Sequence, residues 1–390
     1  MTSILLPEAE AEIEAIVHEA AGSKSPLAIH GGGTRDIGRP VQAARVLSTQ
    51  ALTGITLYEP SEMVLAARAG TKLSEIEAAL KANRQRLAFE PIDWRPLLGT
   101  RGEPTIGGVT ASNAAGPRRI QAGAARDHLI GVRAVTGRGE TIKSGGRVMK
   151  NVTGYDLVKL MAGSWGTLGI LTEVTYKLLP EAETETTLVI EGLSAERAVQ
   201  AMSAALGTPF EITGAAHLPG SPSRTLLRFE GFSASCAYRR DRLTAHLKPF
   251  GLATAVEGEP SKALWRPIAD VTALGAAPHD AVWRISVKPS DGPAVGARLE
   301  AELGSRLFYD WGGGQIWASA RDEGDAGAAA IRAAIGRGGH ATLVRASHAT
   351  RAAVPVFEPQ PPAIAAIAEK IRAEFDPARV LNPGRMNWDA

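Results

Sequence analysis

Residues 104–119 read PTIGGVTASNAAGPRR, and Gly123 and the pair Arg126-Asp127 follow shortly after. The whole segment from Gly99 to Arg126 is dense in glycine, proline, asparagine and arginine, and it is too long for a connection without a function. Small residues at this density let a backbone approach a flat ring and its phosphates closely. A flexible surface loop is the alternative, but such loops rarely carry so many interleaved β-branched residues. We therefore expect a ligand-binding loop.

A second glycine-rich segment lies further upstream, where PLAI at residues 26–29 is followed by HGGGT at residues 30–34. A short buried strand that runs into three glycines allows the backbone amides to turn inward around an anion such as a pyrophosphate. A glycine-rich hairpin without a ligand explains the same residues. The spacing fits neither the dinucleotide fingerprint of Rossmann domains nor the P-loop lysine motif, which disfavours nicotinamide and ATP.

Length and composition limit the possible functions. A chain of 390 residues fits two domains, each large enough to bury a core. The net charge is +2 without a marked run of like charge, so we expect no nucleic-acid or lipid surface. The chain shows no signal-peptide pattern at its start and no apolar run of about 20 residues, the length of a membrane helix. We expect a cytoplasmic protein, at most bound peripherally to a membrane through a partner.

The single cysteine, Cys236, excludes a disulfide within the chain and an iron–sulfur cluster held by several of its thiolates. Electrons accepted by this chain would have to leave to oxygen, to a diffusible acceptor, or to a separate protein.

Helix and strand patterns alternate along the whole chain, which predicts an α+β fold. A β-α-β-β-α-β order runs from Thr186 to Val256 and returns from Ala281 to Ala346. We expect two ferredoxin-like halves joined edge to edge in one antiparallel sheet, with helices on one face. The predicted domains are residues 1–180, residues 181–348 as a cap, and residues 349–390 as a segment that returns to the first domain.

Two further segments complete a specific set: GGRVMKNVTGYDL at residues 145–157 and GSWGTLGILTE at residues 163–173. With the first two segments, in this order and spacing, they resemble the vanillyl-alcohol-oxidase class of PCMH-type FAD-binding proteins, and within it the FAD-binding E subunits of bacterial glycolate oxidases. The resemblance covers residues 26–180 and 375–386; the middle of the chain resembles the family by its layout and by DWGG at residues 310–313. It implies a flavin domain built from both chain ends, capped by a central sheet domain with substrate between them.

The resemblance also implies which residues contact FAD. The cofactor-binding residues it implies are Gly31, Gly32, Gly33, Thr34, Thr105, Gly107, Gly108, Asn113, Gly116, Arg118, Gly123, Arg126, Asp127, Ile170 and Asn382. Covalent flavin in this class usually joins a histidine that follows a Gly-Gly pair, or a cysteine. His30 precedes its glycines and Cys236 lies in the cap, so we predict non-covalent FAD.

The catalytic residues are less well defined. Oxidation of glycolate needs a cation for the carboxylate, a base for the hydroxyl proton and the flavin as hydride acceptor. Arg118 and Arg119 are candidates for the carboxylate, with phosphate or partner contact as the alternative. Lys150, Tyr155 and Trp311 are candidates for the ring pocket, although Tyr155 and Trp311 are equally well explained as packing aromatics. The sequence indicates no base and no metal site, because the histidines are isolated and the metal-binding His-x-Gly-x-Gly-Asn-x-His segment of related D subunits is missing.

Taken together, the resemblance implies an FAD subunit of glycolate oxidase that works with a second flavin subunit, the D type, and an iron–sulfur subunit, the F type. The overall reaction would convert glycolate to glyoxylate. Two alternatives remain open: an independent FAD-dependent 2-hydroxy-acid dehydrogenase, and a scaffold subunit that keeps the fold without catalysis.

Overall fold

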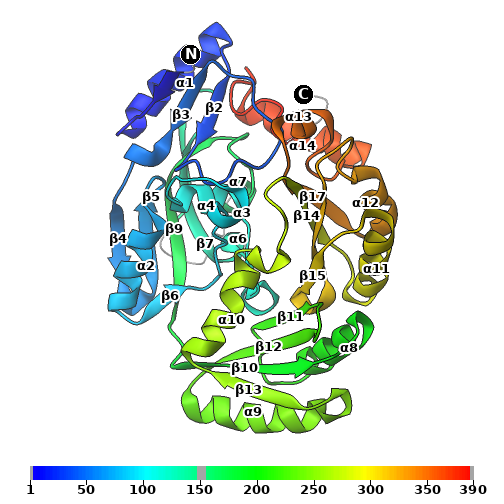
Figure 1. Ribbon diagram of the computed structural model, residues 1–390. Coiled ribbons are helices and arrows are strands. Elements are labelled where there is room, and N and C mark those ends of the chain that lie inside the picture. Colours follow the sequence, from blue (N-terminus) through cyan, green and yellow to red (C-terminus); the bar gives the residue numbers. More distant parts are fainter. Residues whose placement is uncertain (1–2, 147–154, 387–390) are drawn as a thin grey trace. The chain divides into compact units, whose positions relative to one another are not determined.

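The computed structural model describes residues 3–146 and 155–386, so the candidate Lys150 and the rest of residues 147–154 lie outside the described residues (Figure 1). The chain forms two compact units. The first contains residues 1–114, 124–181 and 359–390, and the second contains residues 115–123 and 182–358.

The first unit begins with a small parallel sheet. Strands β1 (Ser3–Leu5), β2 (Leu27–His30) and β3 (Arg45–Ser48) pair in the order β1-β3-β2. Helix α1 (Glu10–Ser23) is placed by Ile13, Val17 and Ala20, whose spacing puts them on one helical face. These three side chains are fully buried in a cluster with Leu27 and Leu47, so the helix packs onto the sheet.

A second, antiparallel sheet forms the rest of this unit, in the order β4-β5-β9-β7-β8 with β6 beside β9. Its strands are β4 (Ile55–Glu59), β5 (Val64–Arg68), β6 (Gln85–Leu87), β7 (Leu129–Val135), β8 (Thr141–Gly145) and β9 (Ile170–Pro180). The helices of this region are α2 (Leu73–Ala82), α3 (Arg95–Leu98), α4 (Ile106–Ser112), α6 (Ala125–His128) and α7 (Leu157–Met161). Apolar residues of α2, α4 and α7 share a buried cluster with β5, β7 and β9.

The second unit is built on an eight-stranded sheet in the order β13-β10-β12-β11-β15-β16-β14-β17. The first half contains β10 (Thr184–Glu191), α8 (Ala195–Leu206), β11 (Gly214–Leu218), β12 (Arg224–Gly231), α9 (Ser233–Leu247) and β13 (Ala253–Glu257). The second half contains β14 (Asp280–Ser286), α11 (Gly292–Leu303), β15 (Leu307–Asp310), β16 (Gln315–Arg321), α12 (Ala328–Ile335) and β17 (His340–Arg345). The halves meet where β11 pairs with β15, at His217 and Tyr309. The two β-α-β-β-α-β halves joined edge to edge agree with the prediction.

The expectation that helices cover only one face of this sheet is wrong. Helix α10 (Glu259–Ala269) was not predicted, and it lies on the face opposite α8 and α9 (Figure 1). Leu188 and Ile190 of β10 pack in the cluster beneath α8 and α9. Thr187 points the other way, because side chains alternate along a strand, and it accepts a hydrogen bond from Trp265 Nε1 of α10 at 2.8 Å.

The chain leaves the second unit later than the expected boundary at residue 348. Helix α13 (His348–Ala353) and the residues after it stay with the second unit, because Val354 and Val356 are buried in its core and Leu343 N donates to Val356 O at 2.8 Å. Helix α14 (Pro362–Phe375) then belongs to the first unit. Helix α5 (Arg119–Ala122), inside the glycine-rich loop, belongs to the second unit. None of the helices in the described part of the chain is both long and apolar enough to span a bilayer.

Candidate functional site

The glycine turn after β2 forms one wall of a pocket in the first unit. A Cβ on Gly32 would lie 1.8 Å from the carbonyl oxygen of Glu103, so the turn and the segment around residue 103 pack backbone to backbone. Gly33 has φ of +71°, a left-handed conformation that favours glycine. The backbone of this turn can therefore approach a ligand as closely as it approaches Glu103.

Helix α4 forms the facing wall. Its N-cap is Thr105, whose hydroxyl accepts a hydrogen bond from Gly108 N at 3.3 Å. A Cβ on Gly107 would lie 2.7 Å from the Cβ of Ala69, and a Cβ on Gly31 would lie 2.4 Å from Thr105 Oγ1. The small residues of this loop thus bring the start of α4 against both the glycine turn and the end of β5.

The pocket combines apolar walls with a polar end at the glycine turn. Its lining is Ile29, His30, Gly31, Gly32, Gly33, Thr34, Arg35, Asp36, Thr49, Ala69, Thr105, Gly107, Gly108, Ala111, Ser112, Trp165, Gly166, Gly169, Ile170, Leu171 and Arg385. Apolar side chains beside exposed backbone amides suit a ligand with a planar ring system and phosphates.

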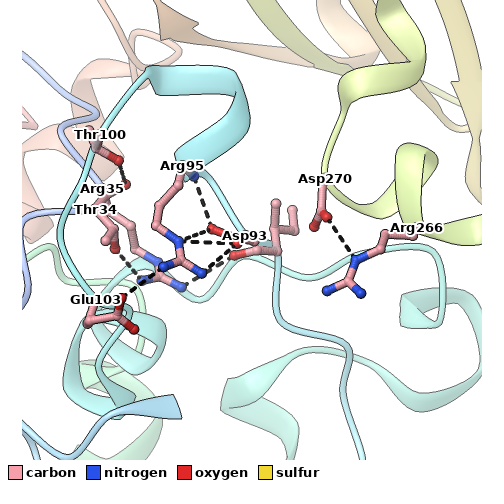
Figure 2. A network of polar contacts seen from close by, with 9 residues as sticks. Thr34, Arg35, Asp93, Arg95, Thr100, Glu103, Arg266 and Asp270 are labelled. Atoms are coloured by element: carbon pink, nitrogen blue, oxygen red, sulfur yellow. Dashed lines mark hydrogen bonds and ion pairs between the residues drawn. The ribbon is translucent and has the colours of Figure 1, made fainter. Parts of the chain in front are cut away.

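Arg35 brings a cation to the pocket lining. Figure 2 shows its side chain with those of Thr34, Asp93 and Arg95. Its Nη1 donates to Thr34 Oγ1 at 3.1 Å, whereas its Nε is buried without a hydrogen-bond partner. Burial lowers the pKa of Arg35 to about 10, partly offset by the charge of Asp93, so the side chain stays protonated at neutral pH. Arg95 donates two hydrogen bonds of 3.0 Å to Asp93 and so compensates that carboxylate. The Arg35 cation therefore retains a donor for an anionic ligand.

Arg385 brings a second cation to the pocket from the far end of the sequence. Its Nε donates to Ile37 O at 3.1 Å and its Nη2 to Arg35 O at 3.2 Å. Its guanidinium lies 5.8 Å from the centre of the Trp165 ring, within cation–π range. Arg385 therefore holds the glycine turn and the Trp165 turn in place.

Asn382 reaches the same region but lies behind the pocket wall. Its Oδ1 accepts from Ile29 N and its Nδ2 donates to Trp165 O, both at 2.8 Å, and it is 1% exposed. Asn382 is not among the residues that line the pocket. Its side chain joins β2 to the Trp165 turn, which is a positioning role.

His30 lines the pocket at the end of β2. Burial lowers the pKa of His30, and the charge of Arg385 lowers it further against the opposing effect of Asp36. The imidazole is therefore neutral at neutral pH, which suits a hydrogen-bonding residue rather than a cation.

The structure brings together about half of the predicted cofactor residues. Those that line the pocket are Gly31, Gly32, Gly33, Thr34, Thr105, Gly107, Gly108 and Ile170. Asn113, Arg126 and Asp127 lie instead at the far end of α4, where Asn113 Oδ1 accepts from Arg126 N at 2.9 Å and Asp127 caps α6. Gly116, Arg118 and Gly123 belong to the second unit.

The residues proposed from the sequence as catalytic candidates, where the structure describes them, do not line this pocket. Arg118 pairs with Glu230 at 3.0 Å, and both side chains are largely buried. The Arg119 guanidinium lies 5.1 Å from the ring centre of Trp311, whose Nε1 donates to Gly116 O. Tyr155 is 91% exposed.

Several lining residues were missed from the sequence. Arg35 and Asp36 directly follow the quoted glycine turn, and Trp165 and Gly166 lie inside a quoted segment, so local position pointed to them. Arg385 lies in the segment 375–386 that the resemblance covers, three residues after the predicted Asn382, but its contact with Arg35 depends on folding.

Comparison with known proteins identifies the family to which this chain belongs. A family model described as "FAD binding domain" matches residues 2–145. The glycolate oxidase subunit GlcE of Escherichia coli is 33% identical over 371 residues, which cover 95% of this chain and 95% of that protein. The chain belongs to the GlcE family of FAD-binding proteins. The predicted cofactor, FAD, and the predicted class, an FAD-dependent oxidoreductase, are thereby confirmed.

Other relatives match mainly half of the chain. The D-lactate dehydrogenase of Archaeoglobus fulgidus is 33% identical over 48% of this chain and 41% of its own length. The glycolate oxidase subunit GlcD of Bacillus subtilis is 30% identical over 52% of this chain and 42% of its own length. A solved structure of alkyldihydroxyacetonephosphate synthase has a TM-score of 0.72, at 17% identity, and covers 97% of this chain and 76% of that one. This likeness confirms the fold of a PCMH-type FAD domain with a cap.

Proposed function

We propose that this chain is the FAD-binding subunit of a glycolate oxidase, which converts glycolate to glyoxylate. The observation that carries the proposal is the match to GlcE, which spans 95% of both chains. A match of that extent includes the sheet of the second unit, whereas the match to the D-lactate dehydrogenase covers about half of this chain.

The pocket suits the cofactor in its chemistry. The backbone of residues 31–34 and the Arg35 guanidinium would hold the pyrophosphate, since the buried Nε of Arg35 still has a proton to donate. The apolar walls, with Ile170 and Leu171, would exclude water from the ring system. When bound, the flavin supplies an acceptor for the hydride of the substrate.

We infer that FAD is held without a covalent bond. Cys236 is 2% exposed and packs in the core beneath α9, with its sulfur 3.4 Å from Arg239 Nη2. His30 precedes the glycines instead of following them. Denaturation of the holoprotein should therefore release all of its flavin.

The proposed complex includes a second, D-type flavin subunit and an F-type iron–sulfur subunit. The named relatives include two distinct glycolate oxidase subunits, GlcE and GlcD. With Cys236 as its single cysteine, this chain offers no set of thiolates for a cluster, so onward electron transfer needs another carrier. A cytoplasmic location, with peripheral membrane contact through the complex, stays a prediction.

Two alternatives differ from this proposal in measurable ways. A stand-alone 2-hydroxy-acid dehydrogenase is favoured by the similarity to D-lactate dehydrogenases, and it would turn over substrate without partners. A scaffold subunit would carry no flavin.

The first experiment is an anaerobic absorption spectrum of the purified chain, before and after addition of glycolate. We expect a flavin band that bleaches with glycolate, either in the chain alone or after addition of the partner subunits. Bleaching in the chain alone places a working substrate site here, and D-lactate is the control for a different hydroxy acid. A chain that purifies without flavin and takes up none from solution would contradict the proposal and favour the scaffold.

A further inference from the structure

The sheet of the second unit has one apolar face and one face on which polar side chains lie among apolar ones such as Phe308 and Trp317. Ala281, Trp283 and Ile285 of β14 are fully buried in the core beneath α11 and α12. Because side chains alternate along a strand, Arg284 and Ser286 point to the opposite side, which we call the polar face. The cross-strand neighbours of Arg284 there are Trp317 on β16 and Thr342 on β17.

Arg284 is a half-buried cation, and the described residues, 3–146 and 155–386, give its guanidinium no hydrogen bond or ion pair. Burial, together with the positive charge of Arg119, lowers the pKa of Arg284 to about 10. The positive charges of Arg284 and Arg119 act on each other, which makes this region favourable for an anion.

In the first half of the same sheet, an arginine on this face has its charge balanced and its donors paired by neighbouring protein groups. Arg228 of β12 donates to Thr213 Oγ1 at 3.2 Å and to Thr213 O at 3.1 Å, and it lies 3.5 Å from Glu230. Its guanidinium also stacks on Trp265 at 4.7 Å. Arg118 shares Glu230. Arg228 and Arg118 therefore share an acidic partner, whereas the part of the chain that the structure describes gives Arg284 none.

An unused acceptor lies beside Arg284. Gln315 of β16 is 1% exposed, and its Oε1 is buried without a hydrogen-bond partner. It pairs across the strands with Ser286, so it occupies the position diagonal to Arg284, about 7–8 Å away between Cα atoms in such sheets. A buried acceptor left unpaired costs free energy, which a hydroxyl donor would recover.

We propose that Arg284 holds the carboxylate of the 2-hydroxy acid, and that Gln315 accepts a hydrogen bond from its hydroxyl group. A 2-hydroxy acid carries both groups on adjacent carbons, so one small molecule satisfies the unpaired cation and the unpaired acceptor. This assignment replaces Arg118, which is paired with Glu230, as the residue that recognises the carboxylate. It rests on the proposed function, because it deepens the choice of substrate.

The test measures binding rather than turnover. Glycolate is titrated calorimetrically, without oxygen, into the FAD-loaded chain and into the variants Arg284→Gln and Arg284→Lys. We expect Arg284→Gln to weaken binding roughly 100-fold, as loss of a charge-assisted bidentate contact does, with Arg284→Lys in between. Gln315→Ala should weaken binding of glycolate about 10-fold but leave acetate, which lacks the hydroxyl, unchanged. Arg298→Gln, an exposed change on α11, is the matched control.

Each outcome decides something different. If the FAD-loaded chain binds glycolate and Arg284→Gln binds it equally well, the assignment of Arg284 is wrong while the proposed function stands. If the FAD-loaded chain binds no glycolate, the substrate site is not on this polar face. Flavin content, measured for every variant, separates both outcomes from a failure to bind FAD.

Discussion

At the scale of single residues, the site depends on groups whose partners are incomplete. Arg35 and Arg284 are both half-buried arginines whose pKa burial lowers, and among the described residues Arg35 Nε and the Arg284 guanidinium have no hydrogen-bond partner. Arg228 shows the alternative, an arginine that the protein satisfies by itself. Incomplete pairing is costly in a folded protein, and at Arg35, which lines the pocket, a bound anion would complete it.

Arg35 gives a prediction at this scale. Arg35→Gln should weaken FAD binding about 10-fold or more, because a charge-assisted hydrogen bond to a phosphate is lost. The dissociation constant is measured by fluorescence titration of the apoprotein with FAD. Arg45→Gln, which removes an ion pair between β3 and Glu19 of α1 in the same unit, is the control. Equal affinities of Arg35→Gln and the control would show that Arg35 does not contact the cofactor.

At the scale of elements, contacts between distant segments hold the pocket walls together. The segment after α14 runs beside β2, where Leu27 N donates to Val380 O and Asn382 N donates to Leu27 O. Fully buried Asp376 accepts from the amides of Val380 and Leu381 and so shapes that segment. The conformation of the C-terminal segment therefore helps to fix the position of β2 and of the glycine turn that follows it.

Glu10 gives a prediction about pH at this scale. It begins α1 and accepts hydrogen bonds from Arg133 on β7 and Thr172 on β9. Burial by itself would raise the pKa of Glu10, but these hydrogen bonds and the charge of Arg133 outweigh burial and lower it. A lowered pKa stabilises the fold above the carboxyl's unfolded value, about 4.3, and this stability is lost as the pH falls through the folded value.

We therefore expect Glu10→Gln to reduce the free energy of unfolding by about 1 kcal/mol at pH 7, with allowance for partial solvent exposure. The difference from the parent protein should disappear once the pH falls below the folded-state pKa of Glu10, where this carboxyl is protonated in both states. Urea denaturation at several pH values measures both. Glu19→Gln, in a more exposed pair with Arg45, should change stability by less than about 0.5 kcal/mol. A difference that does not depend on pH would refute the role of the Glu10 charge.

At the scale of the whole molecule, the chain forms two units with separate cores, and only one of them lines the FAD pocket. The pocket for FAD is lined entirely by residues of the first unit. The first unit is assembled from three stretches of chain and the second from two. Binding of the cofactor should therefore stabilise most strongly the region where the two chain ends meet the glycine-rich segments.

Hydrogen exchange tests this division. On addition of FAD to the apoprotein, we expect protection to increase most in residues 29–36, 103–112 and 165–171, because a ligand that binds only the folded state suppresses local opening. Peptides from α9 and α12, which lie in cores of the second unit, provide the baseline. Equal protection of both sets of peptides would contradict a cofactor site built by the first unit.

The sequence by itself determined the features that depend on neighbouring residues. Glycines at residues 31–33 are needed where backbones nearly touch, and the alternation of apolar residues specifies both β-α-β-β-α-β halves, so each was visible without coordinates. The family followed from the same segments, because close packing around a ring and a pyrophosphate constrains several residues at fixed spacing.

Only the tertiary structure decided which distant residues meet. It paired Arg118 with Glu230, placed Arg385 against Arg35, and set α10 on the face opposite α8. The physical reason is that a long-range contact depends on how elements pack and on which side chain a buried charge finds, and neither is encoded in local spacing. The surroundings of Arg284 were hidden for the same reason, since its burial and its proximity to Arg119 arise only on folding.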